Sequence, residues 1–423
     1  MDGRWIKNFN DIATTDARKN GLKIIESGLD AIDTEKVILN SIRLENNTLT
    51  VKDLRFNLND FKNVKVVGFG KAACKAALTL ESILGSKIKD GAVIGLDKVT
   101  CDYVETYQGN HPLPTIANVE ASRHIFEISK NSDENDLVIV IVSGGGSALL
   151  CWPEKEYEQG QRLYKEFLRC GGTIQDLNTI RKHISMMKGG GLAKVLYPAT
   201  VVGLIFSDVP GPHYDCVASG PTYKDASTVS EAENISEKFG LGNFEFLETP
   251  KDDSYFEKVH NVVLTSNLAA LEAMSTKALE LGFKPWIISS EIYDTPETII
   301  EKFSLAAKQN SAVFAGGETC LKVNHNGGSG GRNLFLGMKG MFSFPKDSLF
   351  ISFASDGMDN GPSAGAIIDA PTRERLEKSG LNIDDFIERY DPQSLFDKID
   401  SLIFTGPTNA NVSDLMMLLR QDK

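Results

Sequence analysis

Short apolar runs followed by glycine-rich segments recur along the chain. The clearest covers residues 137–150, LVIVIVSGGGSALL, where six apolar residues precede a serine and three glycines. A continuous apolar run of this length predicts a strand buried on both faces, as in a parallel sheet, and the residues after the glycines predict a helix. Residues 64–73 repeat the pattern, with Lys71 inside the glycine segment. Such strand–glycine–helix units indicate an α/β fold.

The same pattern extends over the whole chain. Two helices are predicted within residues 11–42, and a helix cap is predicted at Thr295, followed by proline at the first helical position. Asn411 is expected to cap a last helix, with Asp414 at its third position. Further helices are predicted over residues 73–84, 118–129 and 173–187. Further strands are predicted over residues 91–96, 103–107, 199–206, 262–265, 286–289, 312–315 and 349–353.

The composition changes after Tyr223, and residues 224–260 are polar, acidic and weakly periodic. We place a domain boundary there, so that residues 1–245 form one domain and residues 246–423 a second. Strands and helices alternate in both halves. This alternation predicts two α/β domains, the first a doubly wound, Rossmann-like parallel sheet.

Composition and charge exclude several classes of protein. The chain has 423 residues, of which 41% are hydrophobic and 24% charged, as in an ordinary globular protein. A net charge of −12 argues against a general nucleic-acid binder, so an anionic substrate would need local cations. We expect no membrane segment and no signal peptide. The six cysteines form no CxxC pair, which favours reduced thiols in the cytoplasm.

The glycines of the central stretch point to an anion site. Gly144, Gly145 and Gly146 let the backbone approach a ligand closely, and a helix that begins there directs unpaired N–H groups toward it. Ser143 and Ser147 add hydroxyl groups. A tight turn without a ligand is the alternative, but one glycine would suffice for that turn. Three glycines favour phosphate or carboxylate binding.

Basic residues lie inside three glycine-rich segments: Lys71, Lys188 and Arg332. Phosphoryl transfer needs cations for developing charge, donors for the phosphates and a metal ion. Asp208 and Asp356 each follow a predicted strand, where a carboxylate can hold Mg²⁺ or orient a substrate hydroxyl. A capping or turn role is an equal alternative for each aspartate.

Two further polar residues lie in predicted loops. Glu318, in Gly-Gly-Glu-Thr, would position a nucleotide ribose or a cation, or stabilise a turn. His111 would bind substrate or serve the structure. No P-loop is present, and residues 68–73 fit only the looser GxGxxA fingerprint. Residues 327–331 fit GxSxG, but no helix pattern follows to form a nucleophile elbow.

Taken together, these motifs resemble those of a known family. From about residue 64 to residue 415 the chain resembles the class II glycerate kinases, the glycerate 2-kinases whose C-terminal module is called MOFRL. Nine motifs occur in the order found there: VVGFGKAA, GNHPLP, IVSGGGSALL, LNTIRKHISMMKGGGLA, SDVPG with ASGPT, GGET, GGRN, ASDGMDNGP and TGPTNANVSDL.

The resemblance implies ATP-dependent phosphorylation of D-glycerate to 2-phosphoglycerate with Mg²⁺, in a cleft between two α/β domains, the second a smaller mixed sheet. It implies that Lys71, Arg332 and Asp208 are catalytic. The residues implied to bind glycerate or phosphate are Ser143, Gly144, Gly145, Gly146, Ser147, Lys188 and Asn409. Those implied to bind nucleotide are Gly316, Gly317, Glu318 and Gly331, and those implied to bind metal are Asp208 and Asp356.

Two alternatives stay open at this point. One is a kinase that makes 3-phosphoglycerate or acts on another hydroxy acid. The other is a non-catalytic sensor of sugar acids or nucleotides on the same fold, since fold does not fix function. Retention of the cations and carboxylates argues against the sensor. A homo-oligomer is compatible with either.

Overall fold

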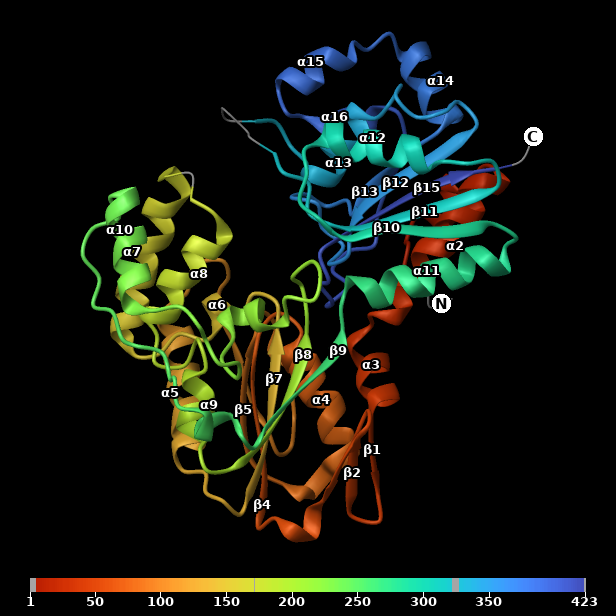
Figure 1. Ribbon diagram of the computed structural model, residues 1–423. Helices are drawn as coiled ribbons and strands as arrows, with labels where there is room; N and C mark the ends of the chain where they lie inside the picture. Colours follow the sequence, from red (N-terminus) through yellow and green to blue (C-terminus); the bar gives the residue numbers. More distant parts are fainter. Residues whose placement is uncertain (1–4, 171, 322–326, 422–423) are drawn as a thin grey trace. The chain divides into compact units, whose positions relative to one another are not determined.

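The computed structural model describes residues 5–170, 172–321 and 327–421, which form two compact units (Figure 1). The parallel-sheet unit comprises residues 34–207 and 213–264. The mixed-sheet unit comprises the segment up to Asp33, residues 208–212, and the chain from Thr265 onward. Each unit is therefore discontinuous in sequence. None of the described helices is both long and apolar enough to cross a bilayer.

The parallel-sheet unit is built on six strands in the order β6-β5-β4-β7-β8-β9. The pairings that join β6, β5, β4, β7 and β8 are all parallel. Every residue of the central β7 is buried, because helices and loops cover both faces of the sheet. The predicted parallel α/β fold is confirmed. The strands are β4 (Asn63–Phe69), β5 (Ile88–Gly95), β6 (Glu105–Gln108), β7 (Asp136–Ser143), β8 (Thr200–Phe206) and β9 (Val259–Thr265).

Three helices of this unit share a small core of their own beside the sheet (Figure 1). Leu163 and Phe167 of α7 (Glu154–Cys170) pack with Ile180 of α8 (Ile174–His183) and with α10 (Val229–Phe239). The helix predicted over residues 173–187 thus ends at His183. The other elements are α3 (Thr34–Ser41), β1 (Ile42–Glu45), β2 (Thr48–Val51), β3 (Leu54–Asn57), α4 (Ala73–Leu84), α5 (Ile116–Lys130), α6 (Gly146–Leu149), α9 (Gly191–Leu196) and the 3₁₀ segment η3 (Tyr214–Ser219).

The mixed-sheet unit has six strands in the order β10-β11-β15-β12-β13-β14. Its last strand in sequence, β15 (Asp414–Arg420), lies between β11 (Ser311–Gly317) and β12 (Ser348–Ala354) and is antiparallel to both. The prediction of a helix capped by Asn411 is therefore wrong. Leucine and methionine favour helices, but the buried position between two strands overrides that preference. The remaining strands are β10 (Lys284–Ile292), β13 (Gly365–Ile368) and β14 (Leu402–Ile403).

The N-terminal helix α2 (Asp16–Ala31) belongs to the mixed-sheet unit, although the sequence analysis placed it in a domain ending at residue 245. Leu22 and other apolar residues of α2 join a core with Leu271 of α11 (Asn267–Glu280) and the strands of the mixed sheet. The buried Arg18 guanidinium donates to both oxygens of Asp369, at 2.7 and 2.8 Å. Amphipathic spacing predicts such a helix but cannot identify its distant partner.

The other helices of this unit flank the mixed sheet. Thr295 caps α12, as predicted, by accepting a hydrogen bond from the N–H of Thr298. A helix does follow the glycines of residues 327–331, contrary to the sequence analysis, and it begins at Arg332. The helices are α1 (Phe9–Ile12), α12 (Pro296–Ala306), α13 (Arg332–Lys339), α14 (Ala370–Ser379), α15 (Ile383–Glu388) and α16 (Pro392–Lys398).

Candidate functional site

In the parallel-sheet unit, the loops after β4 and β7 are tied together. The strands are parallel neighbours, with Phe69 opposite Val142, so both loops leave the same edge of the sheet. The backbone N–H of Lys71 donates to the carbonyl of Gly144 at 2.8 Å. The Ser143 hydroxyl accepts from the N–H of Ala72 at 3.1 Å. The structure thus brings Lys71 to the predicted anion loop, and it uses Ser143 to hold the two loops together.

Gly145 permits close packing at the centre of this loop. Its φ is +78°, and a Cβ there would lie 3.1 Å from Cγ of Lys71 and 3.1 Å from Cδ2 of His111. A larger residue would be both strained and crowded. The glycine therefore lets the Lys71 and His111 side chains lie against the loop backbone.

The hydroxyl of Ser147 is held by residues from two other segments. It lies 2.8 Å from the hydroxyl of Ser219, which donates to the Asn178 side-chain oxygen at 3.2 Å. With the Ser219 proton directed to Asn178, Ser147 donates to Ser219 and keeps oxygen lone pairs for another donor. Asn178 lies on α8, so that helix is coupled to the glycine loop.

The side chain of Lys188 is engaged with other residues of the parallel-sheet unit. Its side chain is buried, and its ammonium group donates to the carbonyl of Leu150 at 2.6 Å and forms an ion pair with Glu156. Burial raises the pKa of Glu156, and Lys188 opposes that rise. The structure thus shows Lys188 in an interior ion pair, and its role in phosphate binding stays a prediction. Glu156 precedes Lys188 by 32 positions, and the sequence holds no signal that joins them.

In the mixed-sheet unit, Arg332 forms the first residue of α13 and lies between two carboxylates. It donates to Glu318 at 2.9 Å and also to Asp414. Glu318 follows β11 and Asp414 begins β15, opposite Gly317 of β11. Asp414 is not among the site residues predicted from the sequence, because its position is predicted to be helical. The apolar run that follows it, residues 415–419, is the signal that could have indicated a central strand.

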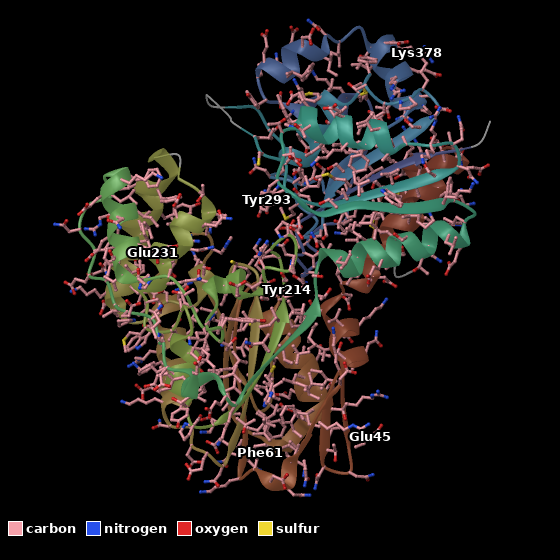
Figure 2. The ribbon with its side chains drawn as sticks, viewed as in Figure 1. Glu45, Phe61, Tyr214, Glu231, Tyr293 and Lys378 are labelled. Atoms are coloured by element: carbon pink, nitrogen blue, oxygen red, sulfur yellow. The ribbon has the colours of Figure 1, made fainter. Side chains whose placement is uncertain are left out.

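Burial controls the electrostatics of this group. Desolvation raises the pKa of Asp414 to about 7, although Arg332 opposes the rise. Burial alone would lower the pKa of Arg332, but Asp414 and Glu318 outweigh it and raise that pKa. Tyr293, labelled in Figure 2, follows β10, and burial together with Glu318 raises its pKa to about 12. Asp208 also contributes to that rise, so it belongs to the same electrostatic group.

The segments carrying Asp356 and Asn409 are also joined. The N–H of Thr408 donates to the carbonyl of Asp356 at 3.0 Å, and Asn409 follows with a φ of +57°. The Asp356 carboxylate accepts from the N–H of Met358 at 3.2 Å, which is the turn role weighed for it in the sequence. The structure thus places Asn409 in the mixed-sheet unit and next to the Asp356 loop.

The predicted nucleotide-binding glycines have packing roles in the structure. A Cβ on Gly317, whose φ is +143°, would lie 2.2 Å from the carbonyl of Ile292. A Cβ on Gly331 would lie 2.3 Å from Asp359, whose carboxylate accepts from the N–H groups of Asn333 and Leu334 at the start of α13. Gly316 likewise packs against Asn267. These glycines shape the loops from which Glu318 and Arg332 extend.

The described residues contain no group of three or more histidine, cysteine, aspartate or glutamate side chains arranged to hold a metal ion. Magnesium is commonly held by one or two carboxylates together with substrate phosphates and water. Asp208 and Asp356 offer the hard oxygen atoms that Mg²⁺ prefers, and Glu318 and Asp414 pair with Arg332. The donor set therefore fits a metal brought in with a nucleotide.

Comparison with known proteins identifies the family. A family model described as a domain of unknown function, DUF4147, matches residues 21–245, and the MOFRL family model matches residues 311–414. A D-glycerate 2-kinase of Thermotoga maritima is 31% identical, covering 95% of this chain and 97% of that protein. A glycerate 2-kinase of Picrophilus torridus is 32% identical, covering 99% of this chain and 100% of that protein.

The solved structure of a Thermotoga maritima glycerate kinase has a TM-score of 0.82 and 28% identity, covering 95% of this chain and 99% of that one. The similarity therefore includes both units rather than one of them. The resemblance drawn from the motifs is confirmed, and the chain belongs to the MOFRL-containing family of glycerate kinases.

Proposed function

We propose that the protein is a glycerate 2-kinase, which transfers the γ-phosphoryl group of ATP to the 2-hydroxyl of D-glycerate and releases ADP. The observation that carries the proposal is nearly full-length similarity to glycerate 2-kinases. The retained cations and carboxylates of both units argue against a non-catalytic sensor. A kinase fits the cytoplasmic location expected from the sequence, where ATP is available.

The parallel-sheet unit is proposed to bind glycerate. Lys71 lies against the glycine loop, where it would meet negative charge on the transferred phosphoryl group. The backbone of Gly144–Gly146 and the Ser147 hydroxyl would contact the substrate oxygens. Ser143 would act indirectly, because its hydroxyl is engaged with Ala72.

The mixed-sheet unit is proposed to bind the nucleotide through the loops of Gly316, Gly317, Glu318 and Gly331. Arg332 would contact phosphate oxygens with its planar guanidinium. Asp208 and Asp356 would hold Mg²⁺ when it is bound with the nucleotide. The ion would neutralise phosphate charge. Asn409 would support the Asp356 loop.

In the proposed reaction, the 2-hydroxyl oxygen of glycerate forms a bond to the γ-phosphorus while the bond from that phosphorus to the ADP oxygen breaks. The hydroxyl proton passes to a carboxylate, for which Asp208 is the candidate. Lys71 and Arg332 stabilise the charge that develops on the equatorial oxygens. In this mechanism the protein orients the two substrates and stabilises the developing charge, and it forms no covalent intermediate with the phosphoryl group.

The test is to incubate the protein with ATP, Mg²⁺ and D-glycerate and to supply the product to enolase, which accepts the 2-phosphate. We expect phosphoenolpyruvate to form without added mutase. Product that enolase consumes only after a phosphoglycerate mutase is added would show a 3-kinase instead. ATP that is not consumed with any hydroxy acid would contradict the kinase assignment.

A further inference from the structure

Arg181 on α8 projects into a small pocket that the proposed reaction has not yet used. The pocket is lined by Arg181 and Ser147 together with Pro112, Tyr164 and the buried Lys188–Glu156 pair. Ser147 belongs to the glycine loop, and Asn178, one turn before Arg181 on the same helix face, is linked to it through Ser219. The pocket therefore opens beside the proposed glycerate site.

The guanidinium of Arg181 has no counterion in hydrogen-bond contact. Throughout residues 5–170, 172–321 and 327–421, no acceptor oxygen forms a hydrogen bond or ion pair with it. Tyr164 and Glu156 both act to raise the pKa of Arg181, but Glu156 is already paired with Lys188, so those two charges cancel. Burial lowers the pKa of Arg181 to about 10, which leaves the group charged at neutral pH. The pocket is thus lined by one partly buried positive charge that no hydrogen-bonded carboxylate among the described residues compensates.

The size of the pocket limits what can pair with that charge. Its volume is about 30 Å³, which leaves room for a group of only a few atoms. A carboxylate, with two oxygens on one carbon, fits such a space, whereas a nucleotide does not. Arginine binds a carboxylate through two parallel N–H···O bonds, which fixes orientation as well as charge. An arginine held only by distant charges is available for such a contact.

We propose that Arg181 binds the carboxylate of the acid substrate and so positions its 2-hydroxyl beside Lys71. This inference rests on the proposed function only for the identity of the acid. It assigns Arg181 to substrate selection and leaves Lys71 and Arg332 to phosphoryl transfer. The chemistry predicts a preference for 2-hydroxy carboxylates over their neutral amides, because an amide leaves the guanidinium without its counterion.

The test compares binding of D-glycerate and of glyceramide, its neutral amide, to the wild type and to the Arg181→Gln and Arg181→Lys variants, by calorimetry without ATP. We expect Arg181→Gln to weaken D-glycerate binding by roughly 30-fold or more, the scale of losing one partner of a buried charge pair. Arg181→Lys should lose less, because it keeps the charge but not the paired contact. Glyceramide binding should be equal in all three proteins. Arg123→Gln, an exposed arginine on α5, is the matched control and should behave as the wild type.

Steady-state kinetics supply a second readout. For Arg181→Gln, KM for D-glycerate should rise by a similar factor, while KM for ATP stays within twofold. Unchanged D-glycerate binding in a folded Arg181→Gln protein would overturn the proposal. If the wild type phosphorylates no D-glycerate, the kinase assignment fails separately, and a panel of other small hydroxy acids then tests the pocket. Equal binding of every acid to the wild type and to Arg181→Gln would reject the proposed carboxylate site. Weaker binding of an acid to Arg181→Gln than to the wild type would support it.

Discussion

The two units arrange charge differently at the edges of their sheets. In the parallel-sheet unit, Lys188 and Glu156 cancel each other and Arg181 leaves an excess of positive charge. In the mixed-sheet unit, Arg332 lies between Glu318 and Asp414, and Asp208 and Asp356 add further negative charge. A positive pocket suits a small anionic acid, whereas an excess of carboxylates suits a nucleotide accompanied by a cation. The difference supports the proposed division of substrates between the units.

The largest expected effect concerns the buried ion pair of Lys188 and Glu156 in the parallel-sheet unit. Lys188→Met should lower the free energy of unfolding by about 3–5 kcal/mol, because Glu156 then lies buried without its partner. Burial raises the pKa of Glu156, so this loss should be small near pH 4, should grow as the pH rises above the ordinary pKa of a glutamate, and should level off above the raised pKa. Denaturant unfolding at several pH values measures it.

The double variant Lys188→Met with Glu156→Gln is the control, since it removes both charges and should recover most of the stability. A Lys188→Met protein of normal stability whose turnover falls 100-fold would instead return Lys188 to the substrate site.

The next effect compares the cations of the two units. Lys71→Ala and Arg332→Ala should each lower kcat by roughly 10²-fold, the scale of losing one transition-state donor. Their double variant should lose less than the product of the two factors, because both groups are proposed to act on one transferred phosphoryl group. Kinetics at saturating D-glycerate measure this.

ATP binding alone should change much less than turnover. Arg332→Ala also leaves Asp414 buried without its partner, so Arg332→Ala with Asp414→Asn serves as a stability control. Near-normal kcat in either single variant would remove that residue from the catalytic group.

A smaller effect is expected at the glycine loop. Gly145→Val should lower kcat/KM for D-glycerate by roughly 10-fold or more, because a branched side chain at a φ of +78° is strained and would displace Lys71. Gly240→Val is matched for strain, with a φ of +62°, but its Cβ would meet nothing within 4 Å. Equal activities of the two variants would show that the loop is only a turn.

The smallest effect should sharpen the assignment of metal to the mixed-sheet unit. Asp208→Asn and Asp356→Asn should each raise the Mg²⁺ concentration for half-maximal rate by roughly 10-fold, since a hard cation loses an anionic oxygen. Arg181→Gln should leave that concentration unchanged. Unaltered Mg²⁺ titrations in both aspartate variants would return these residues to turn and capping roles.

Sequence patterns predicted the parallel sheet well because its central strand β7 is a continuous apolar run followed by glycines. The run of β7 could be assigned from residues 137–143 alone. The strand β15 could not, because its leucines and methionines are equally compatible with a buried helix. Only pairing with β11 and β12, which lie far away in sequence, decides between the two.

The candidate site shows the same limit. Lys71 follows a predicted strand and reaches the glycine loop through local geometry, so spacing was informative. Lys188 also precedes glycines in sequence, but its ammonium group pairs with Glu156. The position of Glu156 depends on how α7 packs. No local sequence pattern marks Arg181, because its proposed role follows from its lack of a hydrogen-bonded counterion among the described residues. Sequence patterns therefore located the loops, and tertiary packing determined which charges pair inside the protein.

The position of β15 has a consequence for folding during synthesis on the ribosome. All strands of the parallel-sheet unit are synthesised before β10, so that unit can fold while the rest is still being made. The helix α2 is synthesised still earlier but packs on a sheet whose inner strand β15 follows all the other described strands in sequence. Its apolar face therefore lacks part of its native partner until β15 has been synthesised. Since β15 carries Asp414, the counterion of Arg332, a nascent chain acquires the group proposed to bind the nucleotide only after β15 has joined the sheet.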